Sequence, residues 1–202
     1  RNVQNLRSTS YEVCRVSQLF DPSFAAASLS AIALSALTGC AGMAPAEPRV
    51  DNAALPDAVR VPAGQAQSLY TTGTGEITYE CREKKAGGGH EWAFVAPVAT
   101  LTNAKGQVVG KYHAGPTWET NDGSKVTGKQ LAVSPAPAGN IPLQLVQANP
   151  ATGEGAMKGV SFIQRLKTVG GVAPALPCGA EQLGQKQVVP YRADYAFYKP
   201  AM

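Results

Sequence analysis

The stretch Glu76-Ile77-Thr78-Tyr79-Glu80-Cys81 alternates polar and apolar residues, and this alternation decides the fold of the chain. Successive side chains of a β-strand point to opposite faces, so Ile77, Tyr79 and Cys81 are expected to share one face. The polar residues share the other face. One apolar and one polar face are typical of a half-buried strand in an antiparallel sheet.

The same alternation returns downstream, in runs that are separated by turn residues. A second run, over residues 92–96, is expected to end at Pro97. The turn sequences Asn103-Ala104-Lys105-Gly106 and Asn121-Asp122-Gly123-Ser124 each lie between two apolar runs and predict hairpins. Later runs complete about eight strands, at 141–147, 160–166, 187–191 and 193–198. We therefore expect one all-β domain, either an antiparallel β-sandwich or a small β-barrel.

The segment before these strands has the pattern of a bacterial lipoprotein signal. Residues 24–37 are uncharged and rich in Ala, Ser and Leu, and they lead into Leu37-Thr38-Gly39-Cys40. About fourteen residues suit the apolar part of a signal peptide but fall short of the roughly 20 that span a bilayer. We expect residues 1–39 to be a signal peptide with an upstream extension, and Cys40 to carry the lipid. The alternative is a buried, Ala-rich helix.

The lipid would attach the protein to a membrane, its expected partner. Residues 40–63 contain four prolines and several alanines and predict an extended tether, which leaves residues 64–202 for the β domain. Ala41, rather than aspartate, follows the lipidated cysteine, and by resemblance to sorted bacterial lipoproteins this favours the outer over the inner membrane. The expected location is therefore the cell envelope, on the periplasmic face of the outer membrane or at the cell surface.

The remaining two cysteines, Cys81 and Cys178, form an even pair in an oxidising compartment and predict a disulfide. A zinc site is the competing interpretation. The two cysteines are far apart, the chain has no Cys-x-x-Cys, and only His90 and His113 could join them. We expect no metal site.

Charge and glycine motifs bear on other partners and on cofactors. The part after residue 39 carries fifteen basic and twelve acidic residues, a scattered net charge of +3 that does not favour nucleic acid. Gly73-Thr74-Gly75 begins like a dinucleotide fingerprint but lacks its third glycine, and Gly87-Gly88-Gly89-His90 lacks the end of a phosphate loop. No cofactor is expected.

The segment from Tyr112 to Ser124 concentrates side chains that can carry chemistry. His113 is a candidate general base, because imidazole titrates near neutral pH and Glu119 or Asp122 could orient it. Trp118 and Tyr112 are candidates for ligand binding, since an aromatic face can hold a sugar ring. Each has a structural alternative: His113 bonded to a carbonyl, Trp118 in the core and Asp122 as the turn former.

Arg165 is the third candidate for ligand binding. It lies in an apolar run just before a glycine loop, where a guanidinium could hold a carboxylate with two parallel hydrogen bonds. The structural alternative is an ion pair or a brace for the backbone.

A family resemblance covers roughly residues 61–200. It is carried by Tyr79-Glu80-Cys81, Trp92-Ala93-Phe94, Ala114-Gly115-Pro116-Thr117-Trp118-Glu119, Asp122-Gly123-Ser124, Ile163-Gln164-Arg165, Gly170-Gly171-Val172-Ala173-Pro174, Cys178 and Ala193-Asp194-Tyr195. These motifs resemble a secreted bacterial and fungal family catalogued as domain of unknown function 3455. The resemblance implies a single exported domain and no established activity. One position departs from it, because Leu143 stands where relatives tend to have tryptophan.

The leading hypothesis is an exported lipoprotein with a β domain that binds a glycan or another small envelope ligand. The first alternative is a hydrolase or isomerase that uses His113 with Glu119 or Asp122. The second is a structural envelope protein, for which a large exposed apolar patch would be the sign. The sequence leaves open the ligand, whether the protein is an enzyme, and the oligomeric state.

Overall fold

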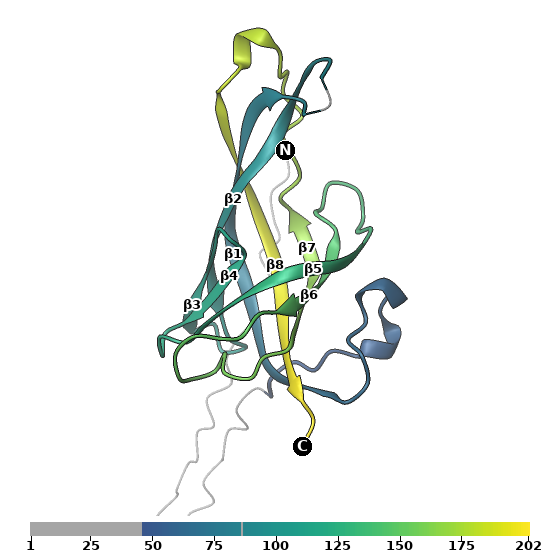
Figure 1. Cartoon of the computed structure of the whole chain (residues 1–202), viewed down its shortest axis with the longest axis vertical. Helices are drawn as coiled ribbons and strands as arrows, with labels where there is room; N and C mark the ends of the chain where they lie inside the picture. Colours follow the sequence, from purple (N-terminus) through teal and green to yellow (C-terminus); the bar gives the residue numbers. More distant parts are fainter. Residues whose placement is uncertain (1–45, 86) are drawn as a thin grey trace, which may run out of the picture. The chain divides into compact units, whose positions relative to one another are not determined.

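Figure 1 shows the computed structural model of the chain, which describes residues 46–85 and 87–202. These residues form eight strands: β1 (Gln65–Glu83), β2 (His90–Thr102), β3 (Val108–His113), β4 (Thr117–Thr120), β5 (Lys125–Ser134), β6 (Leu143–Ala148), β7 (Phe162–Gly170) and β8 (Lys186–Pro200). Three short 3-10 turns accompany them: η1 (Asn52–Ala54), η2 (Asp57–Val59) and η3 (Ala180–Gln182). Within these ranges, no helix is long and apolar enough to cross a membrane.

The eight strands form one closed antiparallel barrel. Each strand pairs with the next along the chain, and β8 returns to pair with β1 from Gln65↔Pro200 to Glu80↔Lys186. Closure pairs every strand with a neighbour on each side within the barrel, and of β2 only residues 90–97 lack a partner on the β3 side. The predicted all-β fold is confirmed, in its barrel form rather than as a sandwich.

Two expected strand breaks are wrong. β2 continues through Pro97, which pairs with Ile77 of β1, and the runs expected at 187–191 and 193–198 are one strand, β8. Residues 90–97 have no partner on the β3 side, where pairing begins only at Val98. A residue without an N–H is tolerated at such an unpaired edge.

The alternation in β1 is confirmed, since Ile77, Tyr79 and Cys81 are all buried. The centre of the barrel is aromatic: the ring of Trp118 lies 4.8 Å from that of Tyr112, 5.7 Å from Tyr195 and 6.3 Å from Phe197. These rings point inward from β3, β4 and β8 and fill this part of the lumen. The barrel interior is therefore a packed core at this level, not a channel.

The loop between β6 and β7 contributes to one end of that core. Met157 and Val160 are buried in the main core cluster, and the Met157 N–H donates to Ser124 Oγ at 3.1 Å. A further bridge joins Thr152 to Lys125. This loop is therefore fixed to the turn between β4 and β5.

A second apolar cluster lies on the outer wall of the barrel. Residues 46–63, expected to belong to the tether, instead carry η1 and η2 and bury Val59 and Val61 against Tyr70, Leu145 and Tyr198. Gln164, fully buried, donates to Asn52 Oδ1 at 3.1 Å and to the Val59 carbonyl at 2.7 Å. This part of the expected tether is thus packed onto the domain, and the expected remainder, 40–45, lies outside the described residues.

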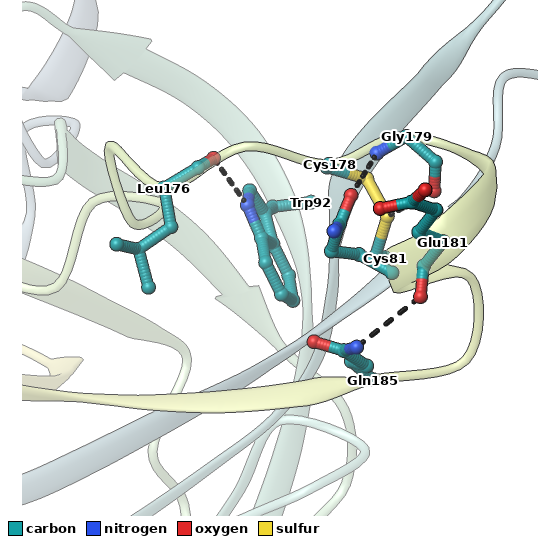
Figure 2. The surroundings of a disulfide bond; sticks show 8 residues. Cys81, Trp92, Leu176, Cys178, Gly179, Glu181 and Gln185 are labelled. Carbon is teal, nitrogen blue, oxygen red and sulfur yellow. Dashed lines mark hydrogen bonds between the residues drawn. A yellow bond between two sulfur atoms is a disulfide. The ribbon is translucent and has the colours of Figure 1, made fainter.

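β1, β2 and β8 run beyond the neighbouring strands as a three-stranded arm, residues 77–83, 90–97 and 186–190 (Figure 1). The predicted disulfide is confirmed here: Cys81 and Cys178 are bonded, with Cα atoms 5.6 Å apart. Figure 2 shows Trp92 beside it, its indole N–H donating to the Leu176 carbonyl at 2.9 Å. The disulfide thereby fastens the loop between β7 and β8 to the arm.

Candidate functional site

A cavity of about 390 Å³ opens into the barrel at the base of the arm. Its lining comes from five strands and the turn between β3 and β4, and comprises Phe94, Val95, Pro97, Tyr112, Ala114, Gly115, Pro116, Gln130, Gln144 and Arg165. We call this feature the mouth cavity. The turn between β3 and β4 lies at the end of the barrel opposite the loop that carries Met157.

The strand register brings the polar side chains of the mouth cavity together. Directly paired residues of neighbouring strands lie on the same face of a sheet. Arg165 is paired with Tyr195, which faces the core, and Gln144 is paired with Arg165. Gln130 is paired with Val146, another core residue. All three polar side chains therefore stand on the inward face, at the open end of the barrel.

Arg165 is braced by the backbone. Its Nε and Nη2 donate to the Pro142 carbonyl at 3.2 and 2.9 Å, which fixes the plane of the guanidinium. In the described part of the chain it forms no ion pair, and among the described lining residues only Arg165 carries a formal charge. Arg165 thus has the backbone brace that was the structural alternative, and it also lines the mouth cavity.

The tyrosines near Arg165 are neutral at neutral pH. Burial raises the pKa of Tyr191 to about 12, and burial likewise raises the pKa of Tyr112. The positive charge of Arg165 acts to lower both pKa values, but it offsets only part of the rise. The charge of Arg165 therefore acts on the interior of the barrel without a compensating negative charge from these phenols.

Two glutamines sit beside the guanidinium. Gln144 Nε2 donates to Gln130 Oε1 at 2.6 Å, so the bond leaves the amide nitrogen of Gln130 and the amide oxygen of Gln144 for other partners. An amide carries both a donor and an acceptor. The pair thus adds hydrogen-bonding groups next to Arg165 without adding charge.

The opposite side of the mouth cavity is apolar and aromatic. Phe94 is 56% exposed and packs edge-on against Tyr79, with ring centroids 6.1 Å apart. The Tyr112 ring stacks on Trp118, which is 1% exposed. Of the three predicted ligand-binding residues, Tyr112 and Arg165 line the mouth cavity, and Trp118 lies behind Tyr112 in the core.

The predicted catalytic residues lie elsewhere. His113 Nε2 is 3.6 Å from Glu119 Oε2, and these side chains are 38% and 26% exposed on the outer wall of the barrel. Partial desolvation acts to raise the pKa of Glu119, but the charges of Lys111 and Lys125 together with the hydrogen bonds from His113 and Lys111 outweigh it, so the pKa is lowered. Glu119 is thus an ionised carboxylate shared between His113 and Lys111.

Asp122 is held within the turn between β4 and β5. Its Oδ1 accepts from Thr120 Oγ1, Ser124 Oγ and the Ser124 N–H, and its Oδ2 accepts from the Ala156 N–H at 2.8 Å. These bonds hold the pKa of Asp122 well below its ordinary value, and the bond from Ser124 Oγ has the largest effect. The structure therefore gives Asp122 turn-forming contacts and does not join it to His113.

Eight of the ten lining residues were not singled out as site residues from the sequence, among them Phe94, Gln130 and Gln144. Gln144 could have been identified from the sequence, because it is a polar residue inside the apolar run 143–146. Leu143, the position that departs from the family resemblance, packs in the cluster on the outer wall and does not line the mouth cavity. In residues 46–85 and 87–202 no three His, Cys, Asp or Glu side chains gather in a way that could hold a metal ion.

Comparison with known proteins gives one match. A family model described as "Protein of unknown function (DUF3455)" matches residues 62–199, which include nearly all of the barrel. No curated protein and no solved structure matches the chain.

Proposed function

The chain belongs to the DUF3455 family, and we propose that its barrel is an extracytoplasmic binding domain that holds a small ligand in the mouth cavity. The family description names no activity, so the proposal is argued from the residues of this chain. The observation that carries it is the convergence of a braced cation, an amide pair and the uncovered ring of Phe94 on one cavity.

The dimensions and lining of the mouth cavity support binding of a small molecule. Ligand sites are clefts of roughly 300–1,000 Å³ with mostly apolar walls and a few placed polar groups. The mouth cavity, at about 390 Å³, falls at the small end of this range. Seven of its ten lining residues stand on strands, so a ligand would meet groups that are already in position.

The proposed location is outside the cytoplasm, on a lipid anchor at Cys40. Cys40 lies outside the described residues, so this part of the proposal depends on the sequence pattern before it. The bond between Cys81 and Cys178 supports it, because structural disulfides persist mainly in oxidising compartments. A lipid anchor would place the binding domain at the outer membrane, close to envelope molecules.

Replacing Cys40 by serine is expected to abolish lipid attachment, because only a thiol can take the lipid. In cells fed labelled palmitate, the wild-type protein should carry label and sediment with membranes. Cys40→Ser should carry none. The matched control is Cys14→Ser, which should label like the wild type. Equal labelling of Cys40→Ser and the wild type would contradict the lipid anchor.

Replacing Ala114 by phenylalanine is expected to block the mouth cavity. Ala114 lies in the exposed turn between β3 and β4 and lines the mouth cavity, so a ring there would occupy ligand space without entering the core. Saturation-transfer NMR would screen a panel of small acids, amines, neutral aromatics and mono- and disaccharides. Any panel member that binds should lose at least about tenfold in affinity in Ala114→Phe.

Ala104→Phe is the matched control, because Ala104 lies in the exposed turn between β2 and β3 and does not line the mouth cavity. It should bind like the wild type. Binding that survives in Ala114→Phe would place the ligand elsewhere, and a panel with no binder at all would count against the proposed function.

A hydrolase or isomerase role has one supporting observation, the contact between His113 and Glu119. Neither residue lines the mouth cavity, and Glu119 also contacts Lys111 at 3.5 Å. A general base needs to reach a proton of a bound substrate. We therefore favour binding over catalysis as the function of this barrel.

A further inference from the structure

We infer that the ligand of the mouth cavity is a small monocarboxylic acid with a flat apolar body, bound through its carboxylate to Arg165. The inference rests on the proposed binding function and names the class of ligand. It predicts that charge, shape and the geometry of the guanidinium each contribute to affinity.

The mouth cavity carries a positive charge, that of Arg165, without a carboxylate among its described lining residues. Three other arginines of the described residues have a carboxylate close by: Arg60 with Asp57 at 2.7 Å, Arg82 with Glu80 at 3.1 Å and Arg192 with Asp194 at 3.9 Å. Arg165 and Arg49 have only backbone carbonyls, those of Pro142 and Gln67, and of these two only Arg165 lines the mouth cavity. A partly desolvated cation without a counter-charge favours an anionic ligand and disfavours a cationic one.

The guanidinium of Arg165 has the geometry to bind a carboxylate. It has five N–H groups in a planar fork, and the two bonds to the Pro142 carbonyl use two of them. Three remain, and the brace already fixes their plane. A carboxylate matches such a fork with two parallel hydrogen bonds. The free amide nitrogen of Gln130 could add a further donor beside them.

The single charge of Arg165 favours a monoanion over a dianion. Phosphate monoesters carry nearly two charges at neutral pH, whereas the mouth cavity supplies one formal positive charge. A single carboxylate matches that charge, and a dianion would leave one negative charge against apolar walls.

The remaining wall of the mouth cavity is apolar and aromatic. Phe94 presents an uncovered ring, and Pro97 and Pro116 add apolar surface on the same wall. The ring of Tyr112 is held rigid by its stack on Trp118. Flat rings pack well against such surfaces by offset or edge-on contact. The body of the ligand is therefore planar and apolar rather than a polyhydroxylated ring.

Isothermal titration calorimetry with benzoate tests the inference, with benzamide as the neutral analogue of the same shape and acetate as the charge without the body. The full mature chain should bind benzoate, and benzamide and acetate should each bind at least about tenfold more weakly. Raising the salt concentration should weaken binding of benzoate and leave that of benzamide nearly unchanged. This comparison needs no variant, so it holds whatever the variants do to folding.

Arg165→Gln should weaken benzoate binding about 10- to 100-fold, because it removes the charge-assisted hydrogen bonds. Arg165→Lys keeps the charge but removes the planar fork of N–H groups, so the loss of affinity for benzoate should be smaller but measurable. Arg82→Gln, on the arm and outside the mouth cavity, is the control and should bind like the wild type. Far-UV circular dichroism and thermal unfolding would check that each variant is folded.

The outcomes separate this inference from the proposed function. If benzamide binds as tightly as benzoate, the carboxylate inference is wrong and the mouth cavity remains a binding site. The same conclusion follows if benzoate does not bind but a neutral panel member does, and Ala114→Phe blocks that binding. If no probe and no panel member binds, both the inference and the proposed function are wrong.

Discussion

Replacing Cys81 and Cys178 together by alanine is expected to lower the free energy of unfolding by about 4–5 kcal/mol, the largest effect that we predict. The bond closes a loop with a sequence separation of 97 residues. In the chain-entropy account, a cross-link over such a loop removes many conformations from the unfolded chain, and its loss restores them. Alanine is preferred to serine because Cys81 is fully buried, and a hydroxyl there would need a new partner.

The measurement is urea-induced unfolding of the oxidised wild type and of the double variant. Here the term wild type means a reference chain that carries Cys14→Ser and Cys40→Ser, so that no other thiol can exchange. The double variant is made in the same reference chain. The transition midpoint of the double variant should fall, and the thermal midpoint should drop by roughly 10–20 °C. The wild type with reductant serves as the control and should unfold like the variant. Coincident transitions of the oxidised wild type and the variant would show that the bond does not stabilise the domain.

Asp122→Asn is expected to lower the free energy of unfolding by about 2–3 kcal/mol at neutral pH. Asp122 accepts four hydrogen bonds through both carboxylate oxygens, from Thr120, Ser124 and Ala156. An amide has one oxygen, so its NH₂ group would face a donor in either orientation. The turn between β4 and β5 would then hold the Met157 loop less firmly, and that loop supplies buried core residues.

The effect of Asp122→Asn depends on pH. The folded-state pKa of Asp122 lies below its ordinary value of 3.8, so the carboxylate stabilises the fold at all pH values above about 4. This contribution is lost as the pH falls below 3.8 towards the folded-state pKa, because the folded state must then bind the proton that the unfolded state already carries. The difference in stability between the wild type and Asp122→Asn should therefore narrow below about pH 4.

Urea unfolding at a series of pH values from 7 to below 4 would measure this difference. Asp57→Asn is the matched control, because the Asp57 side chain is 90% exposed and makes only a surface ion pair with Arg60. Its effect should stay within about 0.5 kcal/mol. A constant difference between wild type and Asp122→Asn across the acid range would contradict the assigned role of the carboxylate.

The candidate site was only partly predictable from the sequence. Tyr112 and Arg165 were identified because aromatic rings and guanidinium groups are common ligand-binding groups, and the structure places both in the mouth cavity. His113 is next to Tyr112 in the sequence, yet it points to the outer wall because successive residues of a strand face opposite sides. Gln130 joins the site only through the register of β5 with β6, which no local pattern specifies.

Bulges made the prediction harder. They shift the register between Thr78 and Tyr79, between Gln130 and Ala132, and between Leu166 and Val169. Each bulge adds a residue to one strand and so reverses which residues face inwards beyond it. Val95 and Phe94 both line the mouth cavity, although strict alternation would place neighbours on opposite faces.

The sequence by itself determined the all-β class, the hairpin turns at 103–106 and 121–124, and the pairing of Cys81 with Cys178. These features depend on local alternation, on turn-forming residues and on a count of cysteines, all of which are properties of short segments or of composition. Only the tertiary structure decided the closure of the barrel, because β1 and β8 pair across more than a hundred residues of sequence. It also decided the mouth cavity, since a cavity requires side chains from five strands and one turn to face the same space, and their register is fixed only when the whole sheet closes.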